Sequence, residues 1–88
     1  MSRVNGVEYI FSSYMATGIA EGFEEAQDCY EYIAAWQYLV TSGLCWSLQG
    51  HFARTAQAMI DQGILASKRT YDPDVGIQYE PMMAEYNN

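Results

Sequence analysis

The segment from Asp28 to Gly43 (DCYEYIAAWQYLVTSG) constrains the fold more than any other part of the chain. Asp28 and Glu31 form a capping box, in which each side chain satisfies a free backbone N–H at the start of a helix. Gly43 suits the left-handed residue that ends a helix. Between these signals, the apolar side chains recur at helical spacing and form one stripe: Cys29, Tyr32, Ile33, Trp36, Leu39 and Val40. The segment predicts a helix near residues 29–42 with Trp36 buried.

A second helix is predicted near residues 6–17. Its apolar side chains share one helical face, at Val7, Ile10, Phe11, Tyr14 and Met15. Asn5 and Glu8 offer another capping box at its start. Gly18 suits the left-handed residue at its end.

The connector IAEGFEEAQ, residues 19–27, is acidic and is interrupted by Gly22. We expect Ile19 and Phe23 to pin it to the core, because they are its large apolar side chains. A helical turn within the connector is an alternative.

A third helix is predicted near residues 51–62, ending at Gly63. Its apolar positions again have helical spacing, at Phe52, Ala56, Met59 and Ile60. The connection before it carries Trp46, which we expect to anchor the turn. The predicted fold class is therefore all-α, a small three-helix domain in which the last two helices form an antiparallel αα-hairpin.

The chain divides into a helical domain, residues 1–66, and a C-terminal tail, residues 67–88. The tail contains both prolines and shows no amphipathic stripe. Apolar side chains alternate at Val75, Ile77 and Tyr79, which favours a short extended segment. We expect the tail to be mostly irregular, and mobile unless it lies along the helices or a neighbouring chain.

The charge balance is strongly acidic, with eleven acidic residues against four basic ones and a net charge of −7. Phosphate contacts need clustered Lys and Arg, so direct nucleic-acid binding and an anionic membrane surface are both disfavoured. An acidic surface suits a basic protein partner. The acidity could instead mimic nucleic acid or serve solubility alone.

Half of the residues are hydrophobic, and eight are Tyr and five are Met. This is more large apolar side chain than a three-helix core needs, so we expect a homo-oligomer or a partner-binding face. Tyr30 and Tyr38 lie off the predicted stripe and are the best candidates for such a face. Ordinary surface tyrosines are the alternative.

No signal peptide or membrane-spanning run is recognisable, and two cysteines do not make a disulfide framework. We therefore expect reduced thiols and a cytosolic location. Cys45 and His51 could meet across the turn, but no residue is identifiable as the acid that would orient them. Cys29 lies on the apolar stripe, where a thiol is inert. We expect no catalysis, no metal site and no cofactor.

The polar residues between the last two predicted helices have a structural interpretation. His51 and Gln49 can bond free backbone groups of the turn, Arg54 can reach the carbonyl end of the preceding helix, and Thr55 can bond back to a carbonyl. The predicted structural turn comprises Gly43, Leu44, Trp46, Gln49, Gly50, Arg54 and Thr55. The alternative is a ligand or partner contact, and the candidate partner surface comprises Tyr30, Tyr38, His51 and Arg54.

The stretch WQYLVTSGLCWSLQGHFARTAQAMIDQGIL resembles a family of small tailed-bacteriophage proteins of unknown function. The shared pattern is Thr/Ser-Gly-Leu-x-Trp-x-Leu-Gln-Gly-x-Phe/Tyr-x-Arg-Thr-Ala, and it covers about residues 33–65. The chain has Ala53 where the family usually has Gly. The resemblance implies a phage origin and a location in the cytoplasm of the infected host, and it implies no reaction.

Together these observations predict a non-enzymatic phage accessory protein. It would bind and modulate a host or phage protein, such as a defence or nucleic-acid enzyme. The alternative is a small oligomeric binder that sequesters a signalling nucleotide or another small ligand. An anionic ligand would need several cations, and this chain has four basic residues in all.

Overall fold

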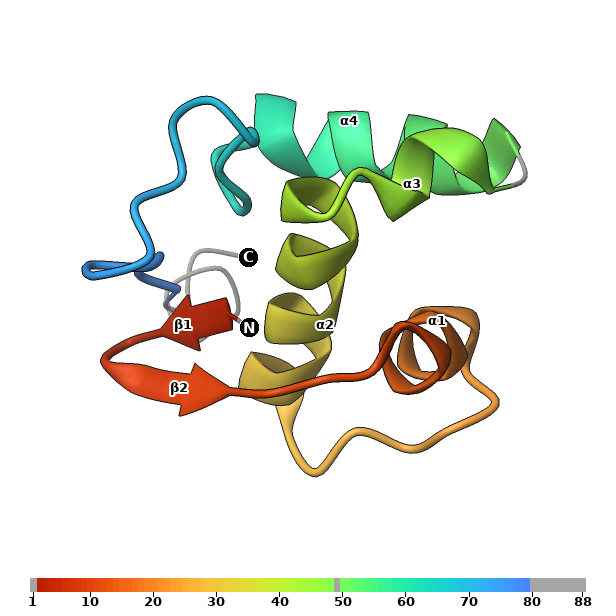
Figure 1. Ribbon diagram of the computed structural model, residues 1–88, viewed down its shortest axis with the longest axis horizontal. Coiled ribbons are helices and arrows are strands. Elements are labelled where there is room, and N and C mark those ends of the chain that lie inside the picture. The colour runs from red at the N-terminus through yellow and green to blue at the C-terminus, as the bar shows by residue number, and fades with distance from the viewer. Residues whose placement is uncertain (1, 49, 80–88) are drawn as a thin grey trace, which may run out of the picture.

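The computed structural model describes residues 2–48 and 50–79. Within them, a two-stranded hairpin comes first along the chain and four helices follow it. The hairpin is formed by β1 (Ser2–Val4) and β2 (Val7–Tyr9). The helices are α1 (Ser13–Glu21), α2 (Cys29–Thr41), α3 (Leu44–Ser47) and α4 (Gly50–Asp61). In Figure 1, α2 lies at the centre, with the hairpin to one side, α1 to the other and α4 across its end. The all-α prediction is therefore wrong, although the chain is mostly helical.

The hairpin turns at Asn5 and Gly6, which have φ angles of 52° and 82°. Positive φ at both central residues is the requirement of the tight turn that matches the twist of two antiparallel strands, and Asn-Gly is its preferred sequence. The strands pair Val4 with Val7 and Ser2 with Tyr9. The predicted helix over residues 6–17 and its capping box are wrong, because the left-handed Asn-Gly pair reverses the chain where that helix would begin.

Helix α1 begins later than predicted, because Ser12 caps it. The Ser12 hydroxyl oxygen accepts a hydrogen bond from the backbone N–H of Met15 at 3.1 Å. The helix continues through Gly18 and ends at Gly22, which has a φ of 87°. Its buried face consists of Ala16 and Ile19. The predicted apolar face is therefore wrong.

Helix α2 confirms the central prediction. The Asp28 carboxylate accepts from the N–H of Glu31 at 2.9 Å, and the Glu31 carboxylate accepts from the N–H of Gln27 at 2.8 Å. Trp36 is buried, with 3% of its surface exposed. Cys29 is exposed, however, so its expected burial is wrong. The buried residues cover more than one stripe: Ile33, Ala34, Ala35, Trp36, Gln37, Leu39 and Val40.

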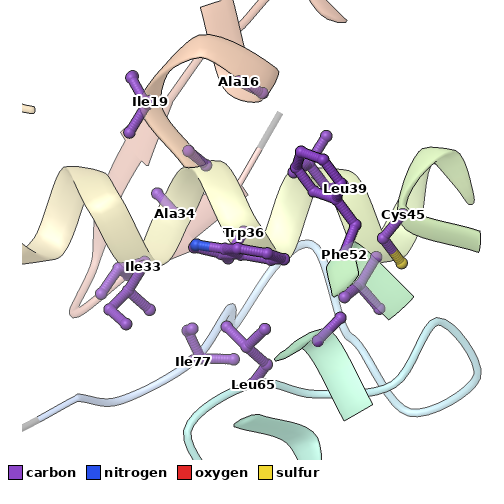
Figure 2. Packing of buried hydrophobic residues seen from close by; sticks show 14 residues of the cluster. Ala16, Ile19, Ile33, Ala34, Trp36, Leu39, Cys45, Phe52, Leu65 and Ile77 are labelled. Atoms are coloured by element: carbon purple, nitrogen blue, oxygen red, sulfur yellow. The ribbon is translucent and has the colours of Figure 1, made fainter. Parts of the chain in front are cut away.

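The wide burial of α2 follows from its central position. Figure 2 shows Ala16 and Ile19 of α1 on one side of α2, and Leu65 and Ile77 on the opposite side. Gln37 is fully buried and its amide holds the chain that follows α4. It donates to the carbonyl of Ala66 at 2.8 Å and accepts from the Ala66 N–H at 2.9 Å.

Helix α4 lies across the C-terminal end of α2 (Figure 1), so the predicted antiparallel αα-hairpin is wrong. The connection contains the short helix α3, which packs against both α2 and α4. This extra turn of helix redirects the chain before α4 begins. The ring of Phe52 in α4 packs against Trp36 of α2, with 5.8 Å between the ring centroids.

The described part of the tail, residues 67–79, returns to the hairpin. Ile77 forms a parallel bridge to Val4, in which its N–H donates to the Arg3 carbonyl at 2.9 Å and its carbonyl accepts from the Asn5 N–H at 2.9 Å. The side-chain N–H of Asn5 donates to the carbonyl of Tyr79 at 2.8 Å, and the side-chain oxygen of Asn5 accepts from the N–H of Tyr79 at 2.8 Å. An extended segment was expected over Val75, Ile77 and Tyr79. Ile77 forms the bridge to β1, whereas Val75 lies in the preceding turn.

Candidate functional site

The residues between α2 and α4 form a short helical connection. Gly43 is left-handed, with a φ of 83°, and it directly precedes α3. The N–H of Leu44 donates to the Ser42 hydroxyl oxygen at 3.3 Å. Gly50 is the first residue of α4. Gln49 was predicted to belong to this turn and lies outside the described residues.

Trp46 does not anchor the turn, because 48% of its surface is exposed. Cys45 takes that position instead. It is fully buried, and Figure 2 shows it beside Leu39 and Phe52. Burial raises the pKa of the Cys45 thiol to about 11, which keeps it protonated and unreactive near neutral pH.

The structure does not bring Cys45 and His51 together as a nucleophile and a base. Cys45 points into the core, whereas His51 is exposed and its ring packs against Phe52 at a centroid distance of 4.4 Å. Within residues 2–48 and 50–79, no group of three or more His, Cys, Asp or Glu side chains is arranged to hold a metal ion. None of the described helices is both long and apolar enough to cross a bilayer.

Arg54 and Thr55 lie exposed on α4. The Arg54 guanidinium lies near Gly50, where a Cβ atom would be 3.3 Å from its Nη1. Among the described residues, the Arg54 side chain forms no ion pair, and the carbonyls at the end of α2 accept from Thr41, Ser42 and Gly43, so the expected link from Arg54 is not made. The expected back-bond from Thr55 is likewise not among the described hydrogen bonds.

Tyr30 and Tyr38 are half-buried, and the chain's own aromatic rings cover them. Tyr30 packs edge-on against Tyr79 at 6.2 Å, and Tyr38 packs against Phe11 at 6.1 Å. The four residues of the candidate partner surface thus lie on α2 and α4, and the rings of three of them, Tyr30, Tyr38 and His51, already pack against other rings of the chain.

A different part of the molecule contains a pocket. It has a volume of about 160 Å³ and is lined by Tyr14, Thr17, Gly18, Glu21, Phe23 and Glu24. The first four of these occupy positions i, i+3, i+4 and i+7 of α1, so they share one face of the helix. This face points away from the one that buries Ala16 and Ile19. We call it the α1 pocket.

The segment after α1 folds back to form the second wall of the α1 pocket. Gly22 reverses the chain, and the N–H groups of Phe23 and Glu24 both donate to the Gly18 carbonyl, at 2.9 and 3.1 Å. Gly18 has no side chain to keep Glu24 away. A Cβ atom at Gly18 would be only 2.9 Å from Cγ of Glu24.

The α1 pocket combines aromatic rings with carboxylates. Phe23 is 82% exposed and Tyr14 is 79% exposed, which is unusual for residues of this size. Glu21 and Glu24 lie beside them, and none of the six lining residues is basic. Within the described residues, the one ion pair joins Arg3 to Glu8, so these carboxylates have no cationic partner. Such a site is suited to a cation.

The α1 pocket was not predicted from the sequence. Tyr14 was expected on a buried helical face and Phe23 in the core, and both expectations are wrong. The Ser12 cap was the available signal, because a helix that begins at Ser13 excludes Val7, Ile10 and Phe11, on which the predicted apolar face depended. The sequence GFEE, which places an aromatic ring next to two acids, was a second signal.

Comparison with known proteins gives one match. A family model described as a domain of unknown function (DUF7417) matches residues 11–81. The matched region includes α1, α2, α3 and α4 and all six residues of the α1 pocket. Neither the curated proteins nor the solved structures include a match to this chain.

Proposed function

The chain belongs to the DUF7417 family, whose members are domains of unknown function, and we propose that it is a non-enzymatic module that binds a basic surface of another protein. The α1 pocket carries this proposal, because it exposes two large aromatic rings next to two carboxylates that pair with no cation of the described residues. Burying a side chain of this size contributes about 1.5–3 kcal/mol. In the isolated chain these rings stay in water, and a partner that covers them would gain this burial free energy on binding.

The overall charge supports a basic partner. The net charge of −7 attracts a positively charged surface at long range and raises the rate of encounter. The resemblance of residues 33–65 to small tailed-phage proteins supports a more specific setting. In this proposal the chain is a phage accessory protein that acts in the cytoplasm of an infected bacterium and modulates a host or phage protein, such as a defence or nucleic-acid enzyme.

Site-specific photo-crosslinking tests the proposal. A photoreactive phenylalanine analogue replaces Phe23 in one variant and Val75 in a control variant, and both are expressed in bacterial cells. Val75 is also exposed but lies in the turn that precedes Ile77, away from α1. We expect a basic protein to be crosslinked at position 23 and not at position 75.

The crosslink should also depend on the pocket's charge. We expect Glu24→Gln to weaken the crosslink and Glu25→Gln to leave it intact. The Glu25→Gln substitution removes the same charge, but Glu25 does not line the pocket. Equal crosslinking at both positions, or a crosslink that ignores Glu24→Gln, would contradict the proposal.

A further inference from the structure

We propose that the α1 pocket receives an arginine side chain of the basic partner. This inference rests on the proposed function and specifies the group that is recognised. It depends on three properties of the described residues: the size of the pocket, the chemistry of its walls and the position of Gly18.

The volume of the α1 pocket fits a small planar group. An apolar cavity of about 150 Å³ holds one benzene molecule, and the α1 pocket measures about 160 Å³. The guanidinium group of arginine, with the methylene that carries it, is comparable in size and is planar. A phenyl ring would also fit this volume, so the chemistry of the walls, not the volume, selects a cation.

The walls offer both interactions that a guanidinium forms. Its flat face stacks on aromatic rings, which Tyr14 and Phe23 provide, and its edge donates paired hydrogen bonds to carboxylates. Glu21 and Glu24 line the same pocket. A basic partner therefore meets complementary charge at the point where the apolar surface is exposed.

Hydration favours arginine over lysine in this pocket. The lysine ammonium is compact and strongly hydrated, whereas the guanidinium is weakly hydrated and loses less when water is removed from one face. The α1 pocket lies at the surface, with both rings largely exposed, so it can strip water from only part of a cation. A cation that stacks with one face and keeps water elsewhere suits it best.

The chain's own cations do not occupy the pocket. Arg3 donates to the carboxylate of Glu8 at 2.8 Å and to the carbonyl of Pro73 at 3.3 Å. Arg54 lies on α4, and Lys68 and Arg69 lie in the turn after it. The six residues that line the pocket include none of these four.

The test compares three capped peptides that differ in one side chain: acetyl-Gly-Arg-Gly-amide, the same peptide with lysine, and the same peptide with citrulline. Citrulline keeps the shape of arginine without its charge. Each is titrated into the ¹⁵N-labelled full chain, and the affinity is read from the amide signals of Gly18, Phe23 and Glu24. We expect the arginine peptide to bind at least about three-fold more tightly than the lysine peptide, and citrulline to show no saturable shift.

Four variants separate stacking, charge and shape. Phe23→Leu keeps an apolar side chain without the ring, and we expect it to weaken arginine binding about two- to five-fold, the equivalent of one exposed cation–π contact. Glu24→Gln should weaken it by a similar factor, and its matched control Glu25→Gln should not. Gly18→Ala should weaken arginine binding, because the new Cβ atom displaces Glu24. The melting temperature should be maintained, because alanine has a higher helix propensity than glycine.

The outcomes distinguish this inference from the proposed function. Equal binding of the arginine and lysine peptides at these amides would overturn the arginine assignment and leave a general basic partner. Saturable binding of the citrulline peptide, or an unchanged affinity in Phe23→Leu, would also overturn it. The amide signals could also shift with protein concentration in the absence of peptide, and these shifts could vanish in Arg54→Gln. This result would identify a second copy of the chain as the occupant, and it would overturn the inference of a basic partner. Absence of binding by every cationic peptide would contradict both proposals.

Discussion

Trp36 and Trp46 show how environment separates two residues of one type. Trp36 is 3% exposed and packs against Phe52, whereas Trp46 is about half exposed. Trp36→Ala should lower the free energy of unfolding by about 3–5 kcal/mol, the usual cost of removing a large buried aromatic side chain. Trp46→Ala should cost less than about 1.5 kcal/mol, since roughly half of its area is already in water. Urea denaturation measures both, and a larger loss for Trp46→Ala would contradict the fold.

Cys45 makes the stability of the protein depend on pH in the alkaline range. Burial raises the pKa of its thiol from 9.0 to about 11. The folded state therefore holds this proton more tightly than the unfolded state, and the resulting stabilisation is fully present below pH 9. It is lost as the pH rises from 9 to 11, by roughly 2–3 kcal/mol at about 1.4 kcal/mol per pH unit.

The same denaturation series in Cys45→Ala isolates the contribution of this thiol. We expect the variant to be less stable at neutral pH, because it leaves a small cavity, and to lose less stability between pH 9 and 11. Parallel pH curves for the two proteins would show that the Cys45 thiol does not carry the dependence.

At the level of elements, the contact between the tail and the hairpin can be tested with two glycines. Gly76 has a φ of 72°, and a Cβ atom there would overlap the backbone carbonyl oxygen of Arg3. Gly63 has a φ of 80° and open space around it. Gly63→Ala should cost about 1–2 kcal/mol for the left-handed backbone. Gly76→Ala should cost about 1–3 kcal/mol more, because the tail must also move off β1. Equal losses in thermal denaturation would contradict the described packing.

The elements also show which parts of the fold were predictable. Helix α2 was predicted because its signals are local: the Asp28 cap, the apolar spacing and Gly43 all act within sixteen residues. The hairpin was missed although Asn5-Gly6 is a strong turn signal, because the alternation in three-residue strands is too short to compete with an apparent helical face. Its support comes from Ile77 and Tyr79, over seventy positions away. No local pattern reveals such a contact.

At the scale of the whole molecule, the acidic character of the surface was predictable and the position of the pocket was not. Charge is a sum over residues, so the net value of −7 needs no structure. The α1 pocket depends on where α1 begins and on how Gly22 folds Phe23 and Glu24 back over Gly18. The predicted helix was assigned a buried face that included Tyr14, whereas α1 buries the opposite face, with Ala16 and Ile19. The candidate partner residues Tyr30, Tyr38, His51 and Arg54 lie elsewhere, on α2 and α4.

The most direct measurement is an amide chemical-shift map of the full chain with a basic peptide. The peptide contains two arginines and two lysines within nine residues, so the result does not depend on a preference between them, and a version with four glutamines is the control. We predict that the basic peptide shifts the amides of residues 14–25 most strongly and that the glutamine peptide does not. Shifts centred on residues 41–63, or spread evenly over the molecule, would contradict the assignment of the α1 pocket as the binding site.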